Sequence, residues 1–136
     1  MLYEIDARLA GRAGDIQATD DDLLYQSYAE AKGDTLRYIF DIPNPGAYRV
    51  TLRFSEVSSP ERTLNVLAEG LEALENFNIF EEAGKREQSA VDKSFAVEVT
   101  DGRLELDLVK VKGKPIVSGI EVICDPGASP IKAKAA

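Results

Sequence analysis

Strict alternation between apolar and polar residues constrains the fold of this chain more than any other feature of the sequence. Residues 48–55 carry a large apolar side chain at every second position, namely Tyr48, Val50, Leu52 and Phe54. The same period of two residues recurs over residues 35–41, 95–99 and 104–108. This period is the signature of strands that bury one face and expose the other. We therefore expect a chain built from antiparallel strands.

Two turn signals lie between the alternating segments. Pro43-Asn44-Pro45-Gly46 separates residues 35–41 from 48–55, and Asp101-Gly102 separates residues 95–99 from 104–108. An Asp-Gly pair tolerates the positive φ angles of a type I′ turn. The sequence therefore predicts two hairpins.

Further strands are expected at residues 2–7, 64–68, 73–77 and 116–123, with an extended piece and a loop at 20–32. Many short strands with turn signals between them, and no βαβ rhythm, favour an all-β antiparallel sandwich. The length of 136 residues fits one domain, which we place at residues 1–124. Pro, Gly and Ser in residues 125–130 indicate that 125–136 is a C-terminal tail or linker.

The start of the chain and its single cysteine bear on its location. Glu4 and Asp6 follow Met1 too closely for a signal peptide, and no apolar run approaches the roughly 18 residues of a membrane span. We therefore expect no membrane insertion, and either a cytosolic protein or a domain of a longer secreted chain. Cys124 follows an apolar run and is expected to be a core or strand-end residue, which leaves the compartment open.

Charge and missing residue types exclude several functions. The net charge is −8, which disfavours nucleic acid and anionic membranes and suits neutral sugars or basic partners. Without histidine, Ser–His–Asp and Cys–His sites cannot form, and one cysteine cannot build a Cys-rich zinc site. The acidic run Asp20-Asp21-Asp22 lacks the spacing of a calcium loop. No metal or cofactor is expected, and paired carboxylates are the only catalytic arrangement left open.

Four parts of the chain resemble malectin and the malectin-like carbohydrate-binding domains. They are LYQS at 24–27, PGAYRVTLRFSE at 45–56, LNVLAEG at 64–70 with FNIFEEAG at 77–84, and DGRL at 101–104 with GKPIVSGIEV at 113–122. Order and spacing agree with the family from residue 24 to residue 122. The resemblance implies a jelly-roll-like sandwich of the carbohydrate-binding-module type. It also implies sugar binding by loops at one end and no catalysis.

The resemblance also indicates where sugar-contacting residues would stand. The loop aromatics of the family fall near Ile16 and Glu30 and at Ser58 and Ser59, and its aspartate falls near Gly113. The chain carries a different residue type at each of these positions. A malectin-like domain that has lost sugar binding is therefore a second hypothesis.

Candidate ligand-binding residues follow from the chemistry of sugars, which stack on aromatic faces and pair with planar polar groups. The alternation places Tyr38, Phe40, Tyr48, Phe54, Phe77 and Phe95 in the core. The remaining candidates near the loops are Tyr25, Gln26, Tyr28, Asp15, Glu56 and Lys112.

Three of these candidates have a structural interpretation as well. Tyr28 would be a partly buried tyrosine at the sandwich edge. Glu56 would form a buried ion pair with an arginine such as Arg53 or Arg12. Lys112, like Lys114, would be a solvated loop charge.

Three functions therefore stay open. The first, which we favour, is a non-catalytic module that binds a neutral, glucose-containing glycan. The second is a protein-interaction or architectural domain that acts with a protein partner or with other domains of a longer parent chain. The third is an enzyme, which would need two carboxylates about 5–9 Å apart in a cleft.

Overall fold

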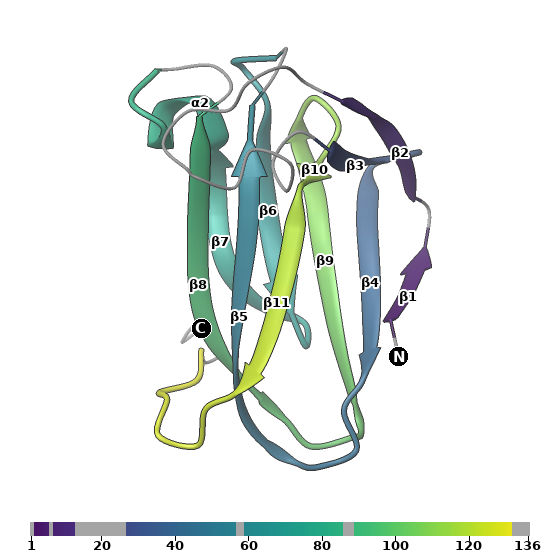
Figure 1. Ribbon diagram of the computed structural model, residues 1–136, viewed down its shortest axis with the longest axis vertical. Coiled ribbons are helices and arrows are strands. Elements are labelled where there is room, and N and C mark those ends of the chain that lie inside the picture. The colour runs from purple at the N-terminus through teal and green to yellow at the C-terminus, as the bar shows by residue number, and fades with distance from the viewer. Residues whose placement is uncertain (1, 6, 13–26, 57–58, 86–88, 132–136) are drawn as a thin grey trace.

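The computed structural model describes residues 2–5, 7–12, 27–56, 59–85 and 89–131, with side chains from Glu30 onward (Figure 1). The strands are β1 (Leu2–Ile5), β2 (Ala7–Arg12), β3 (Ser27–Ala31), β4 (Thr35–Asp41), β5 (Gly46–Ser55), β6 (Thr63–Ala68), β7 (Leu71–Asn78), β8 (Ala90–Val99), β9 (Arg103–Lys112), β10 (Ile116–Val117) and β11 (Gly119–Cys124). A single turn of helix, α2 (Ile79–Glu82), follows β7. Within these residues no helix is long and apolar enough to cross a membrane.

The strands form two facing layers, and the predicted all-β antiparallel sandwich is confirmed. One layer is a five-stranded sheet in the order β1-β4-β9-β6-β7, and the other is the three-stranded sheet β11-β5-β8. A further three-stranded sheet, β10-β3-β2, lies near one end of the sandwich (Figure 1). The pairings that define these sheets are antiparallel.

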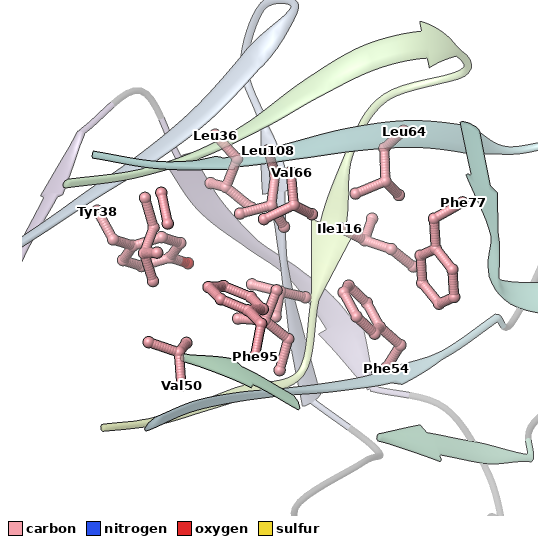
Figure 2. Packing of buried hydrophobic residues seen from close by; sticks show 14 of the residues in the cluster. Leu36, Tyr38, Val50, Phe54, Leu64, Val66, Phe77, Phe95, Leu108 and Ile116 are labelled. Carbon is pink, nitrogen blue, oxygen red and sulfur yellow. The ribbon is translucent and has the colours of Figure 1, made fainter. Parts of the chain in front are cut away.

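The core lies between the two layers and is filled by the inward rows of the alternating strands (Figure 2). The rings of Phe54 and Phe77, which come from opposite layers, lie with centroids 5.0 Å apart. Four of the six aromatics that the alternation placed inside are buried: Tyr38, Phe54, Phe77 and Phe95. Phe40 and Tyr48 are partly buried and pack against this core.

Both predicted hairpins are wrong. Strand β4 pairs with β1 and β9, whereas β5 pairs with β8 and β11, so the connection 42–45 crosses from one layer to the other. The connection 100–102 crosses in the same way between β8 and β9. Alternation tells which face of a strand is buried, but two strands paired side by side and two strands facing each other across a core have the same pattern.

The type I′ turn lies elsewhere than predicted. Gly102 has a φ of 82°, but Asp101 does not adopt a positive φ. Instead, Glu69 and Gly70 have φ values of 53° and 76° and join β6 to β7 as a true hairpin. Both central residues of a type I′ turn need positive φ. Sequence reasoning missed this turn because glutamate seldom adopts that conformation.

Two other predicted strands differ in detail from the structure. The strand expected at 116–123 is divided, because β10 pairs with β3 while β11 pairs with β5. The strand expected at 2–7 likewise ends at Ile5, and β2 begins at Ala7. Cys124 ends β11, as one of the two alternatives expected, and is exposed rather than in the core. Residues 27–31 are extended, while the rest of the expected loop, 20–26, lies outside the described residues.

Residues 125–131 lie against the sandwich. The backbone N–H of Asp125 donates to the Ala47 carbonyl at 3.0 Å, and the Asp125 carboxylate accepts from Arg49 at 3.0 Å. The backbone N–H of Ile131 donates to the Ala96 carbonyl at 2.9 Å, and its side chain packs against the core. This part of the expected tail therefore contacts the domain, and the division at residue 124 stays a prediction.

Glu69 is expected to make the stability of the domain depend on pH. One carboxylate oxygen of Glu69 is buried without a hydrogen-bond partner. Burial, assisted by the negative charges of Asp101 and Glu105, raises the pKa of Glu69 to about 7. A raised pKa means that the folded chain binds a proton more tightly than the unfolded chain. Stability is therefore lost as the pH rises from about 4.5 to about 7.

Glu69→Gln should remove this effect, because the amide resembles the protonated acid. We expect the variant to raise Tm at pH 8 and to leave it nearly unchanged at pH 4, as measured by thermal unfolding. Glu98→Gln, at an exposed position of β8, is the control and should shift Tm little at either pH. An equal shift of Tm at both pH values in Glu69→Gln would show that the charge is not the cause.

Candidate functional site

The loops at one end of the sandwich are where the sequence placed ligand binding. We define the loop end as the described residues of 32–34, 56–62, 79–85 and 113–115 (Figure 1). Strands β5 and β9 finish here, and β3 and β10 pair beside them. The cross-layer connections 42–45 and 100–102 lie at the opposite end (Figure 1).

Glu56, one of the six candidates, is buried at the loop end with only 1% of its surface exposed. It follows β5 two positions after the buried Phe54, so its side chain shares the inward direction. Its carboxylate accepts from the Arg62 Nε at 2.9 Å and from the Ser59 backbone N–H at 3.0 Å. Glu56 therefore has an arginine partner, as the structural interpretation expected.

The partner arginine within the described residues is Arg62, which the sequence did not single out. Arg53 pairs with Asp92 at 2.8 Å and lies 3.6 Å from Glu121, on the outer face of β5. The side chain of Arg12 lies outside the described part of the chain. Arg12 as a further partner of Glu56, and the role of Glu56 in ligand binding, therefore stay predictions.

Arg62 joins three segments that are distant in the sequence. The side chain is 5% exposed, and its Nη1 donates to the Lys114 carbonyl at 2.5 Å and lies 3.9 Å from the Glu30 carboxylate. Its backbone N–H donates to the Ser59 carbonyl at 3.0 Å. A planar guanidinium with five donors suits such a mixed set of carboxylates and a carbonyl.

Sequence reasoning missed Arg62, although one signal was present. Arg62 stands two positions before Leu64, in the same alternating row as Val66 and Ala68, and these three residues are fully buried. A charged residue in an inward row must find partners or remain near the end of the strand. Two of its partners, Glu30 and Lys114, lie too far along the chain for the pattern to identify them.

Lys112 and Lys114 are exposed, in agreement with their interpretation as solvated loop charges. The Lys112 ammonium lies 3.3 Å from the Glu61 carboxylate, with 63% and 76% of the two side chains exposed. The Lys114 ammonium donates to the Lys32 carbonyl at 3.4 Å. An ion pair this exposed contributes little to stability, and the proposed ligand contact of Lys112 stays a prediction.

Tyr28 lies in β3, the middle strand of the sheet β10-β3-β2, and Figure 1 shows β3 beside the loop end. Its Cα partner in β2 is Gly11. The side chain of Tyr28, together with Tyr25, Gln26 and Asp15, lies outside the described residues. The ligand-binding role of all four stays a prediction.

The described residues contain no group of three or more His, Cys, Asp or Glu side chains that could hold a metal ion. The acids Glu69, Asp101 and Glu105 interact at the end opposite the loop end, where Glu69 follows β6 and Asp101 precedes β9. Among the described residues of the loop end, the polar network is centred on the Arg62 guanidinium.

The sequence profile of the malectin domain family matches residues 4–127 of this chain. Among curated proteins, none matches the chain significantly. Similar solved structures include a β-glucuronidase of Bacteroides uniformis, with 21% identity and a TM-score of 0.80 over 91% of this chain and 14% of that one. Another is the complex of the plant peptide RALF23 with FER and LLG2, with 19% identity and a TM-score of 0.78 over 92% of this chain and 34% of that one.

The ANX2 ectodomain from Arabidopsis thaliana is similar as well, with 16% identity and a TM-score of 0.69 over 89% of this chain and 41% of that one. Identities this low show that the fold is shared and nothing more. The chain spans between 14% and 41% of the lengths of these proteins.

Proposed function

Because this chain belongs to the malectin domain family, we propose that it is a non-catalytic carbohydrate-binding module whose loop end binds a neutral glycan. The observation that carries the proposal is the buried network around Arg62. It connects the loop after β5 to the loop before β10, and it reaches Glu30 of β3, two residues after Tyr28. A rim fixed in this way supports binding, because less conformational entropy is lost when a ligand orders it.

The chemistry of the candidate residues supports an uncharged sugar. Tyr25 and Tyr28 offer aromatic faces for stacking, and Gln26 and Asp15 offer polar groups for hydroxyls. A net charge of −8 opposes anionic ligands over the surface as a whole. We therefore propose stacking on a tyrosine with hydrogen bonds from the adjacent polar residues.

A protein partner is the second candidate, and one observation favours it. Ser59 and Gly113, both at the loop end, stand where the family resemblance leads us to expect an aromatic and an aspartate. FER, which shares the fold, is seen in complex with a peptide. A malectin-like domain with a changed rim would recognise a peptide or protein in place of a sugar.

Tyr28→Ala tests the glycan proposal. Loss of one stacking contact is expected to weaken binding by about 1.5 kcal/mol, or about tenfold in Kd. The measurement is isothermal titration calorimetry with soluble α-glucan and β-glucan oligosaccharides. Tyr48→Phe is the matched control, because it removes only the hydroxyl that donates to the Asn44 carbonyl at the opposite end.

Two results would contradict the glycan proposal. One is that the unaltered chain binds neither class of glucan, and the other is that Tyr28→Ala binds as tightly as the unaltered chain. In either case a protein partner becomes the better candidate. It would then be identified by protection of loop-end amides from hydrogen exchange when the partner is added.

A further inference from the structure

We propose that Arg62 is the positioning residue of the loop end. It holds the described residues of the loop 56–62, the loop 113–115 and strand β3 in the arrangement that a ligand meets. The inference rests on the proposed function, since it concerns the same rim. Arg62 is assigned no contact with the ligand. Its role is to act through the segments that it connects.

The contacts of Arg62 reach one partner in each segment. Glu56 lies in the loop after β5, Lys114 lies in the loop before β10, and Glu30 lies in strand β3. The hydrogen bond from the Ser59 N–H to Glu56, by contrast, lies within the loop after β5. Arg62 thus connects the described residues of the loop 56–62 with the other two segments.

The loop 113–115 also packs close to Arg62. Gly113 has a φ of 72°, and a Cβ built on it would lie 3.6 Å from backbone and side-chain atoms of Arg62. Beyond this turn, the Pro115 carbonyl accepts the backbone N–H of Ala31 at 3.0 Å. A displacement of this loop should therefore weaken the hydrogen bond of Ala31 in β3, a residue that Arg62 does not hydrogen-bond directly.

Lysine cannot reproduce this geometry. The Nε of Arg62 donates a hydrogen bond to the Glu56 carboxylate, and its Nη1 donates one to the Lys114 carbonyl. Two donors on one rigid plane therefore hold two segments at once. The ammonium of lysine is a single point charge on a flexible stem. Arg62→Lys therefore keeps the charge that balances the buried Glu56 but loses the connection between the loops.

Hydrogen exchange followed by mass spectrometry on the whole chain tests the connection without any ligand. In Arg62→Lys we expect the backbone amides of Ser59 and Ala31 to exchange at least tenfold faster, while amides in the middle of β5 and β8 stay protected. Glu56→Gln is a second variant and should act in the same direction. Arg53→Lys is the matched control, because Arg53 also pairs with two carboxylates, but on the outer face of β5.

The binding measurement uses the same glucan oligosaccharides as above. We expect Arg62→Lys to raise Kd about tenfold, and Arg53→Lys to leave it unchanged. Unaltered exchange at Ala31 in both Arg62→Lys and Glu56→Gln would overturn the proposal. Faster exchange with an unchanged Kd would overturn it as well. If the unaltered chain binds no glucan, the proposed function fails, while the exchange data still decide whether Arg62 holds the segments together.

Discussion

Replacing Glu56 by alanine is expected to lower the free energy of unfolding by about 3 kcal/mol, at the lower end of the range of about 3–5 kcal/mol for breaking a buried ion pair. The loss arises because Arg62 keeps its charge while losing its partner at 2.9 Å. The Glu30 carboxylate, 3.9 Å from Arg62, compensates part of it. The Ser59 N–H also loses its acceptor. Urea unfolding followed by circular dichroism measures the change.

Glu61→Ala is the matched control for Glu56→Ala. Glu61 lies in the same loop and also faces a cation, but its side chain is 76% exposed, and Lys112 is 3.3 Å away. An exposed pair of this kind contributes about 0–1 kcal/mol. Comparing the two glutamates therefore separates the effect of burial from the effect of charge. Equal losses in the free energy of unfolding would show that the buried Glu56–Arg62 pair contributes no more to stability than an exposed pair.

A double-mutant cycle gives the strength of the pair itself. Glu56→Ala combined with Arg62→Ala should destabilise the chain by less than the sum of the two single changes, because the second change removes a charge that the first left unpaired. An additive result would mean that the two side chains are stabilised independently, and that Arg62 depends on Glu30 and the Lys114 carbonyl instead.

The alternation in the sequence predicted which residues are buried but not which strands are neighbours. Leu104, Leu106 and Leu108 are fully buried in β9, as their spacing requires. The same spacing gave no information on whether β9 pairs with β8 or faces it, because both arrangements bury the same row. The pairing of β9 with β4 and β6 depends on contacts between strands far apart in the chain.

The hydrogen-bond network of the loop end could not be predicted from the sequence for a related reason. Glu56 and Arg62 are six residues apart, but Lys114 follows Arg62 by 52 residues. Hydrogen bonds over such separations leave no periodic trace in a single sequence. Sequence reasoning therefore recognised that Glu56 needs an arginine but named Arg53 or Arg12. Arg53 shares the strand of Phe54 but lies on the opposite face.

Phe54→Ala carries the second large expected effect, because it removes a fully buried ring from the contact between the two layers. Phe54 comes from β5, and its ring lies 5.0 Å from that of Phe77, which comes from β7 in the facing sheet (Figure 2). Truncation of a buried phenylalanine to alanine costs about 3–5 kcal/mol, from lost burial together with the cavity that remains. Domains are typically stable by only about 5–15 kcal/mol, so the variant should unfold at a clearly lower urea concentration.

Ile123→Ala is the control for Phe54→Ala, because Ile123 is also a large apolar strand residue but is 48% exposed, and it should change stability by about 0.5 kcal/mol or less. The pair Phe54→Ala and Phe77→Ala then tests the architecture. Rings that meet across the core should show a coupling of about 0.5–1.5 kcal/mol in a double-mutant cycle. If β5 and β7 did not face each other, the two losses would simply add. Additive losses would therefore contradict the arrangement of two facing layers, on which the position of the loop end depends.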